Sequence, residues 1–217
     1  MPYRAVLFDL DGTLLDTLDD LADSMNQVLA AEDFPTHPVD AYRHFIGNGA
    51  AKLVERTLPE TKRDELTSAR CLDAFRCVYQ QQWNQKTKPY DGVPELLDTL
   101  KNRNVPMAIL SNKPHEFVVQ CVQSLLPDWP FAAVYGQREG IPPKPDPTVA
   151  RDLAETLAVP AEEFIYLGDS GVDMQTAVNA GMLPVGALWG FRDAKELREN
   201  GAARLIEHPL KLIELFD

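Results

Sequence analysis

Short apolar runs alternate with segments of helical spacing through the second half of the chain, and this alternation constrains the fold most. Apolar runs cover residues 105–112, 131–136, 163–170 and 183–190, and helices are expected in the segments between them. Helices are also expected on both sides of a last short run, "ARLIE". One more apolar run, at residues 4–8, stands far from the others. Strands that alternate with helices predict a parallel sheet with helices on both faces.

The segment between the first apolar run and the others has a different pattern. It contains no strand candidate between about residues 15 and 88. Residues 18–29, 39–58 and 60–86 are expected to be helical, with turn signals at "GNG" and Pro59. We therefore expect an α/β fold, with a Rossmann-like three-layer parallel-sheet core and an inserted all-helical cap. The expected domains are a core of residues 1–14 and 88–217 and a cap of residues 15–87.

Composition narrows the classes of partner and the cell compartment. The formal net charge of −12 argues against broad nucleic-acid binding, which needs a basic surface. No apolar run approaches the roughly 18 residues of a membrane span, and the N-terminus shows no export signal. Cys71, Cys77 and Cys121 lack CxxC spacing and are expected to be reduced thiols. We expect a cytoplasmic monomer or small homo-oligomer, with no nucleic-acid or membrane partner.

Polar side chains stand where the predicted strands end. Asp9 and Asp11 follow the first run, Ser111 and Asn112 end the second, and Asp169 ends a later one. Ligands of open parallel sheets bind at the carboxyl ends of the strands, so these groups are expected to meet there. Lys144 lies in a loop that its prolines stiffen, "PPKPDP". Gly12 allows the chain to turn after the first strand, and Thr13 adds a hydroxyl beside it.

Two carboxylates that lie two residues apart face the same side and need a compensating cation. A hard divalent ion with oxygen ligands fits Asp9 and Asp11, and Asp169 completes the cluster; the expected ion is Mg²⁺. Such a site suits phosphoryl transfer, because one carboxylate can attack phosphorus while a second carboxylic acid handles the protons. The negatively charged chain would repel an anionic phosphoryl group. The cation and Lys144 supply the positive charge that offsets this repulsion at the site.

Four motifs in order resemble those of the haloacid dehalogenase-like hydrolase superfamily: "DLDGT" from Asp9, "LSN" from Leu110, "KPDP" from Lys144 and "GDSGVD" from Gly168. The resemblance covers essentially the whole chain. It implies that Asp9 is the nucleophile and Asp11 the general acid/base. It implies three Mg²⁺ ligands: Asp9, the main-chain carbonyl of Asp11, and Asp169. Thr13, Ser111, Asn112 and Lys144 would bind the phosphoryl group, and Asp173 would support the metal or the lysine.

The segment "FIGNGAAKLVERTL", Phe45 to Leu58, resembles the phosphoglycolate phosphatase branch, as does "GMLPVGALWGFR". In that branch the first segment is a cap loop that faces the core site. The candidate substrate contacts in the cap are Arg43, Gly47, Asn48, Gly49 and Lys52. Lys52 and Arg56 share a helix face, and a solvated face with salt bridges is the simpler interpretation of both.

The sequence leaves several functions open. The leading one is a Mg²⁺-dependent phosphomonoesterase of a small phosphorylated metabolite, with 2-phosphoglycolate as the best single substrate. The carboxylate at Asp11 argues against dehalogenation. A phosphosugar mutase, a pyrophosphatase or a nucleotidase of the same superfamily are alternatives. A non-enzymatic aspartyl-phosphate acceptor is an alternative of another class, and the chain length, the helical insertion and Asp11 count against it.

Overall fold

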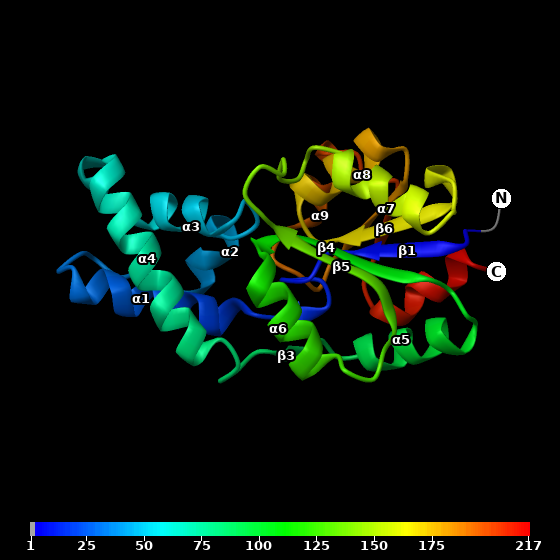
Figure 1. Cartoon of the computed structure of the whole chain (residues 1–217), viewed down its shortest axis with the longest axis horizontal. Helices are drawn as coiled ribbons and strands as arrows, with labels where there is room; N and C mark the ends of the chain where they lie inside the picture. Colours follow the sequence, from blue (N-terminus) through cyan, green and yellow to red (C-terminus); the bar gives the residue numbers. More distant parts are fainter. Residues whose placement is uncertain (1–2) are drawn as a thin grey trace.

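The computed structural model describes residues 3–217, and a six-stranded sheet forms the core of this part of the chain (Figure 1). The strands are β1 (Ala5–Phe8), β4 (Met107–Pro114), β5 (Phe131–Gln137), β6 (Phe164–Gly168), β7 (Leu183–Ala187) and β8 (Arg204–Ile206). Their order is β5-β4-β1-β6-β7-β8, and each neighbouring pair is parallel. The predicted α/β class is confirmed, with the N-terminal strand inserted between strands from the second half.

Helices cover both faces of this sheet. Val6 and Phe8 of β1 pack into one core cluster with residues of α5 (Val93–Asn102) and α6 (His115–Leu125). The alternate residues Ala5 and Leu7 pack into a second cluster with α7 (Thr148–Thr156) and α8 (Gly171–Ala180). This alternation follows from the two-residue period of a strand. Figure 1 shows α5 and α6 on one side of the sheet and α7 and α8 on the other.

Two core elements differ from the sequence-based expectation. Helix α5 was not predicted, because Gly92 and Pro94 mark a turn; in the structure Gly92 is the N-cap and the proline stands in the first turn, where it is tolerated. The last predicted helix is the 3₁₀ helix η4 (Pro209–Leu215), which follows β8. Between β7 and β8 lies α9 (Ala194–Glu199), as expected.

Helices α1 (Leu18–Ala31), α2 (Tyr42–Phe45), α3 (Ala50–Thr57) and α4 (Glu65–Gln82) lie together at one end of the molecule (Figure 1). Two short 3₁₀ turns, η1 (Val39–Ala41) and η2 (Glu60–Lys62), join them. The predicted helical segments 39–58 and 60–86 contain these helices, and the predicted turn signals at "GNG" and Pro59 mark breaks between them. The first is interrupted because Gly47 and Gly49 adopt φ values of +114° and +86°, which a helix does not allow. The second begins after its N-cap Asp64, which accepts from Thr67 N.

The two connections between these helices and the sheet pair with each other. Strand β2 (Leu15–Asp16) is antiparallel to β3 (Lys88–Pro89), so the expectation of no strand between residues 15 and 88 was wrong at both ends. The buried Asp20 carboxylate of α1 accepts from Lys86 N at 3.0 Å, Thr87 N at 2.8 Å and Thr87 Oγ1 at 2.7 Å. These hydrogen bonds hold the segment that leads from the sheet into the helices next to the segment that returns to the sheet. The division into a core and a cap at residues 14/15 and 87/88 stays a prediction.

The three cysteines are free thiols, as expected. Across residues 3–217, every helix is too short or too polar to span a bilayer.

Candidate active site

The predicted polar groups converge at the carboxyl end of the sheet. Asp9 follows β1, and its backbone N–H donates to Leu167 O of the neighbouring β6 at 2.9 Å. Asp169 directly follows β6, and Ser111 and Asn112 lie in the last half of β4. All four side chains are buried. The parallel order β4-β1-β6 therefore brings together residues that are about 160 positions apart in the sequence.

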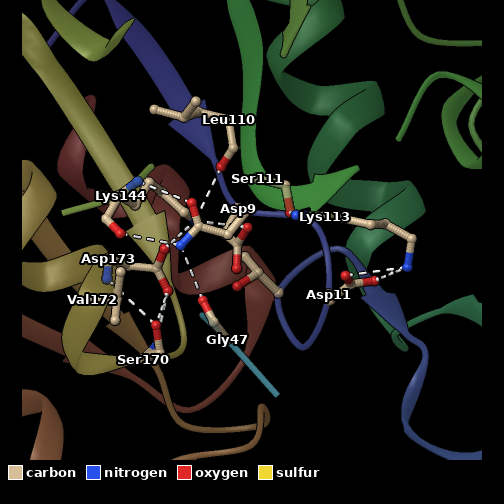
Figure 2. A network of polar contacts seen from close by, with 12 residues as sticks. Asp9, Asp11, Gly47, Leu110, Ser111, Lys113, Lys144, Ser170, Val172 and Asp173 are labelled. Atoms are coloured by element: carbon tan, nitrogen blue, oxygen red, sulfur yellow. Dashed lines mark hydrogen bonds and ion pairs between the residues drawn. The ribbon is translucent and has the colours of Figure 1, made fainter. Parts of the chain in front are cut away.

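A buried lysine lies between two of the carboxylates. Lys144 Nζ is 2.6 Å from Asp173 Oδ1 and 2.9 Å from Asp9 Oδ1, and it donates to Leu110 O at 3.1 Å (Figure 2). Asn112 holds the lysine's backbone: Lys144 N donates to its Oδ1 at 2.9 Å, and its Nδ2 donates to Lys144 O at 3.2 Å. Asn112 thus positions the lysine loop against β4.

The carboxylates outnumber the buried positive charge. Burial, followed by the charge of Asp173, raises the pKa of Asp9 to about 7 despite the opposing effect of Lys144. Burial also raises the pKa of Asp169 well above its usual range, and the charges of Asp173 and Asp9 add to this. Burial alone would lower the pKa of Lys144, but Asp173 and Asp9 raise it well above the ordinary value. Additional positive charge would therefore stabilise this site.

Backbone segments pack closely against the Asp169 side chain, and two of their positions have no room for a Cβ atom. Phe191 N donates to Asp169 Oδ2 at 2.7 Å, and Thr13 Oγ1 donates to Asp169 Oδ1 at 3.5 Å. A Cβ on Gly12 or on Gly190 would overlap the Asp169 side chain. Gly12 also has a φ of +85°, which favours glycine on its own account. Thr13, predicted to bind phosphate, is fully buried with its hydroxyl toward Asp169.

These residues fit a hard divalent cation. One oxygen from each of Asp9, Asp169 and Asp173 lies within 4.8 Å of the others. Asp9 Oδ1 is buried with Lys144 Nζ at 2.9 Å, and a carboxylate oxygen has a further lone pair for a cation. Oxygen atoms on clustered carboxylates are the donors that Mg²⁺ prefers.

Asp173 has several partners of its own. It pairs with Lys144, and its Oδ2 accepts from Ser170 N at 3.1 Å and from the Ser170 hydroxyl. The Ser170 side chain in turn caps the first turn of α8, which makes a capping box. Asp173 is thus fixed by the helix start and in turn fixes the Lys144 ammonium.

The Asp11 carboxylate has a partner that the sequence reasoning missed. Lys113 Nζ donates to Asp11 Oδ1 at 2.8 Å and Oδ2 at 3.2 Å, and to the Tyr79 hydroxyl of α4 at 2.7 Å. Figure 2 shows Asp11 and Lys113 apart from the group around Asp9, Lys144 and Asp173. Asp9 and Asp11 both line the central cavity, as their spacing predicts, yet they pair with different lysines. A lysine directly after "LSN", two residues beyond Ser111 on an apolar strand, was the available signal.

A cavity of about 50 Å³ lies between the sheet end and the cap helices. Asp9, Asp11, Ser111, Asn112 and Asp169 line it from the sheet. Its apolar wall includes Leu21, Ile46, Leu53, Phe75 and Phe117.

The predicted cap contacts divide into two groups. Gly47 and Gly49 line the cavity, and Gly47 O accepts from Asn112 Nδ2 at 3.2 Å. Arg43 does not line it; its Nη1 donates to Gly190 O at 3.0 Å. Asn48 accepts from Arg56 Nη2 at 2.8 Å, and Lys52 pairs with Glu55 at 2.6 Å with its side chain 55% exposed. The simpler interpretation of Lys52, a solvated helix face, agrees with this placement.

Arg192 was also missed. It lines the cavity, pairs through Nε with Glu196 at 3.2 Å, and donates from Nη2 to Ile46 O at 2.8 Å. Its Nη1 is buried without a hydrogen-bond partner within the described residues 3–217. Arg192 is part of the segment "GMLPVGALWGFR" that resembles the phosphoglycolate phosphatase branch, but the sequence analysis predicted no role for it.

The chain matches one family model and is similar in sequence to curated proteins of that family. The family model of haloacid dehalogenase-like hydrolases matches residues 6–187. Phosphoglycolate phosphatase of Pseudomonas syringae pv. tomato is 33% identical over 97% of this chain and 78% of its own length. The enzyme of that name from Mesorhizobium japonicum is 33% identical over 96% of this chain and 92% of its own.

A crystal structure from Lactobacillus delbrueckii subsp. bulgaricus is similar over the whole fold. Its TM-score is 0.93 at 31% sequence identity, with 100% of this chain and 99% of that chain covered. The agreement extends over both the sheet and the inserted helices.

Proposed function

The chain belongs to the haloacid dehalogenase-like hydrolase family and is a phosphatase of its phosphoglycolate phosphatase-like branch, and from this premise we propose its reaction and substrate. It hydrolyses a small phosphomonoester, with 2-phosphoglycolate as the best single substrate, through an aspartyl-phosphate on Asp9. The observation that carries the proposal is the buried group of Asp9, Lys144, Asp169 and Asp173 at the sheet end.

In the first half of the reaction, a carboxylate oxygen of Asp9 attacks phosphorus and the bond from phosphorus to the leaving oxygen breaks. Asp11 gives its proton to that leaving oxygen, so that the alcohol departs neutral. Lys144 and the Ser111 hydroxyl donate to the phosphoryl oxygens. Ser111 lines the cavity, and Lys144 lies 2.9 Å behind Asp9.

In the second half, Asp11 takes a proton from water as that water attacks phosphorus. The bond from phosphorus to Asp9 breaks, inorganic phosphate leaves, and both carboxylates return to their starting states. Asp9, Asp169 and the main-chain carbonyl of Asp11 would hold Mg²⁺, which supplies positive charge against the phosphoryl oxygens. The raised pKa values of Asp9 and Asp169 support the need for that charge.

Two observations support a small substrate. The cavity of about 50 Å³ is lined by the cap helices as well as by the sheet end, so the substrate must fit beneath those helices. The relatives from Pseudomonas syringae pv. tomato and Mesorhizobium japonicum carry the name phosphoglycolate phosphatase. The proposal extends to a cytoplasmic enzyme that needs no macromolecular partner.

The test is inorganic phosphate release from a panel of 2-phosphoglycolate, pyrophosphate, nucleoside monophosphates and hexose phosphates. Each is measured with Mg²⁺, with EDTA and with Asp9→Asn. We expect strong preference for 2-phosphoglycolate, lost in both controls. Preference for pyrophosphate or a nucleotide would keep the mechanism and replace the substrate. A need for a bisphosphate activator with little phosphate release would instead identify a mutase.

A further inference from the structure

The ammonium of Lys113 stands in the wall of the substrate cavity with a carboxylate already bound to it. Its side chain is 4% exposed, and Nζ contacts both oxygens of Asp11 at 2.8 and 3.2 Å. Burial alone would lower the pKa of this lysine, but the charge of Asp11, followed by Tyr79 and Cys121, raises it. Lys113 is therefore held in the cavity wall as the cation of an ion pair.

Tyr79 completes this site from the cap. Its hydroxyl accepts from Lys113 at 2.7 Å, and the ammonium lies 4.7 Å from the centre of its ring. Within residues 3–217 the Tyr79 hydroxyl has no acceptor for its own hydrogen. The Asp11 carboxylate therefore occupies a carboxylate-binding site. The site consists of the Lys113 ammonium and of the Tyr79 hydroxyl, which still has a hydrogen to donate.

Asp11 cannot stay in this arrangement during the reaction. A general acid must bring its proton to the leaving oxygen, and here both carboxylate oxygens are held by Lys113. If Asp11 moved away alone, it would leave a buried ammonium without a counter-ion, which is strongly unfavourable. A second carboxylate that replaced Asp11 on Lys113 would remove that penalty.

The other cations of the cavity are less suited to this role. Arg192 is held by Glu196 and by Ile46 O. Arg76 has a half-exposed side chain that pairs with Asp73 at 3.6 Å. Lys144 lies behind Asp9, does not line the cavity, and is already shared between Asp9 and Asp173.

We propose that Lys113 and the Tyr79 hydroxyl bind the carboxylate of the substrate, and that this exchange releases Asp11, which then takes up a proton from water and gives it to the leaving oxygen. The inference rests on the proposed function and narrows its substrate class to short alkyl phosphates with a carboxylate close to the phosphorylated carbon. A phosphate ester without the carboxylate enters the same cavity but leaves Asp11 on Lys113. Lys113 is then both a specificity residue and the positioning residue of the general acid.

The test compares 2-phosphoglycolate with 2-hydroxyethyl phosphate, which has a neutral hydroxymethyl group in place of the carboxylate. We measure kcat/KM for both substrates in the wild type, in Lys113→Met, and in the matched control Lys52→Met. We expect the wild type to prefer 2-phosphoglycolate, and Lys113→Met to reduce the ratio of the two values about 10- to 150-fold, the range of hydrogen bonds to charged groups. Lys52→Met should leave the ratio unchanged, because that side chain is outside the cavity.

Three results would overturn the inference. Equal loss with both substrates, and so an unchanged ratio, would mean that Lys113 serves only to hold Asp11. If the ratio of the two kcat/KM values fell in Arg192→Met but not in Lys113→Met, the residue that binds the substrate carboxylate would be Arg192. If the wild type hydrolysed both substrates equally well, the enzyme would not recognise the carboxylate, although it would still be a phosphatase.

The proposed function fails by a separate result, namely activity that survives Asp9→Asn. Circular dichroism checks the folding of each variant. If Lys113→Met does not fold, Tyr79→Phe keeps the ammonium and removes one hydroxyl, and a smaller fall in the same ratio is expected. An unchanged ratio in Tyr79→Phe would then count against the inference.

Discussion

Lys144 and Asp173 form an ion pair of 2.6 Å between Nζ and Oδ1, in which the two side chains are 3% and 0% exposed. Neither residue reaches the water, so each depends on the other for its charge balance. Asp173 is also in the first turn of α8, and in this way the start of a helix fixes the position of an ammonium 2.9 Å from Asp9.

Asp173→Asn tests whether this pair positions the lysine. The variant keeps the side-chain size and removes the charge, so we expect kcat to fall about 10- to 100-fold, as for other supporting partners of metal sites. Activity is measured across a Mg²⁺ titration. Asp146→Asn is the matched control, because Asp146 is in the same loop as Lys144 and outside the central cavity. Equal activities of the two variants would contradict a positioning role.

Gly12→Ala is expected to abolish phosphate release. Its Cβ would overlap the Asp169 carboxylate, and its φ of +85° disfavours any residue with a side chain. Gly140→Ala is the control, since Gly140 has a φ of +75° but no heavy atom within 4 Å of the added Cβ. The control should lose a little thermal stability and keep full activity. Residual wild-type activity in Gly12→Ala would show that Asp169 tolerates displacement.

The acidic cluster predicts how metal-free stability depends on pH. The pKa of Asp9 rises from 3.8 to about 7 on folding, so the folded state binds more protons than the unfolded state between these values. In EDTA, this group's contribution therefore makes stability fall as pH rises from about 4 to above 7, and Mg²⁺ should raise the melting temperature more at pH 8 than at pH 5.5. Differential scanning fluorimetry measures both.

Asp9→Asn is the control for this pH dependence. The variant removes one titrating group, so its melting temperature in EDTA should fall less between pH 5.5 and pH 8. A Mg²⁺ effect of the same size at both pH values in the wild type would refute the link between metal binding and the buried carboxylates.

Asp20→Ala should destabilise the chain by about 3 kcal/mol, because three donors of the outgoing segment lose a buried charged acceptor. Asp19→Ala is the control, since Asp19 is the exposed neighbour on the same helix turn. Urea unfolding of both variants gives the difference. A loss below about 0.5 kcal/mol in Asp20→Ala would show that the two connections are not held by this carboxylate.

The sequence predicted the sheet and the strand-end groups because both follow from local patterns. Apolar runs gave the strands, and the parallel order then brought Asp9, Ser111 and Asp169 to one edge. Lys144 also lies where its loop predicted, next to Asp9.

Contacts that depend on the cap could not be predicted in the same way. Lys113 lies two residues beyond Ser111, which indicates the same side of the strand and so the site. Its pairing with Asp11, and with Tyr79 across 34 residues of sequence, follows from no local pattern. The role of Arg192 also depends on where Ile46 packs. Helix α5 was missed for a simpler reason, since a proline in the first turn of a helix resembles a turn signal.

The most direct test of the account is the chemical identity of the phosphorylated residue. Wild type and Asp11→Asn are mixed with 2-phosphoglycolate and Mg²⁺, quenched in acid and digested, and the peptide that contains Asp9 is analysed by mass spectrometry. We predict a phosphoryl group on Asp9 in the wild type. Asp11→Asn should slow both its formation and its hydrolysis, because Asp11 protonates the leaving oxygen in the first step and deprotonates water in the second. Turnover in the wild type with a phosphoryl group on another residue, or with none on Asp9 in either protein, would contradict the account.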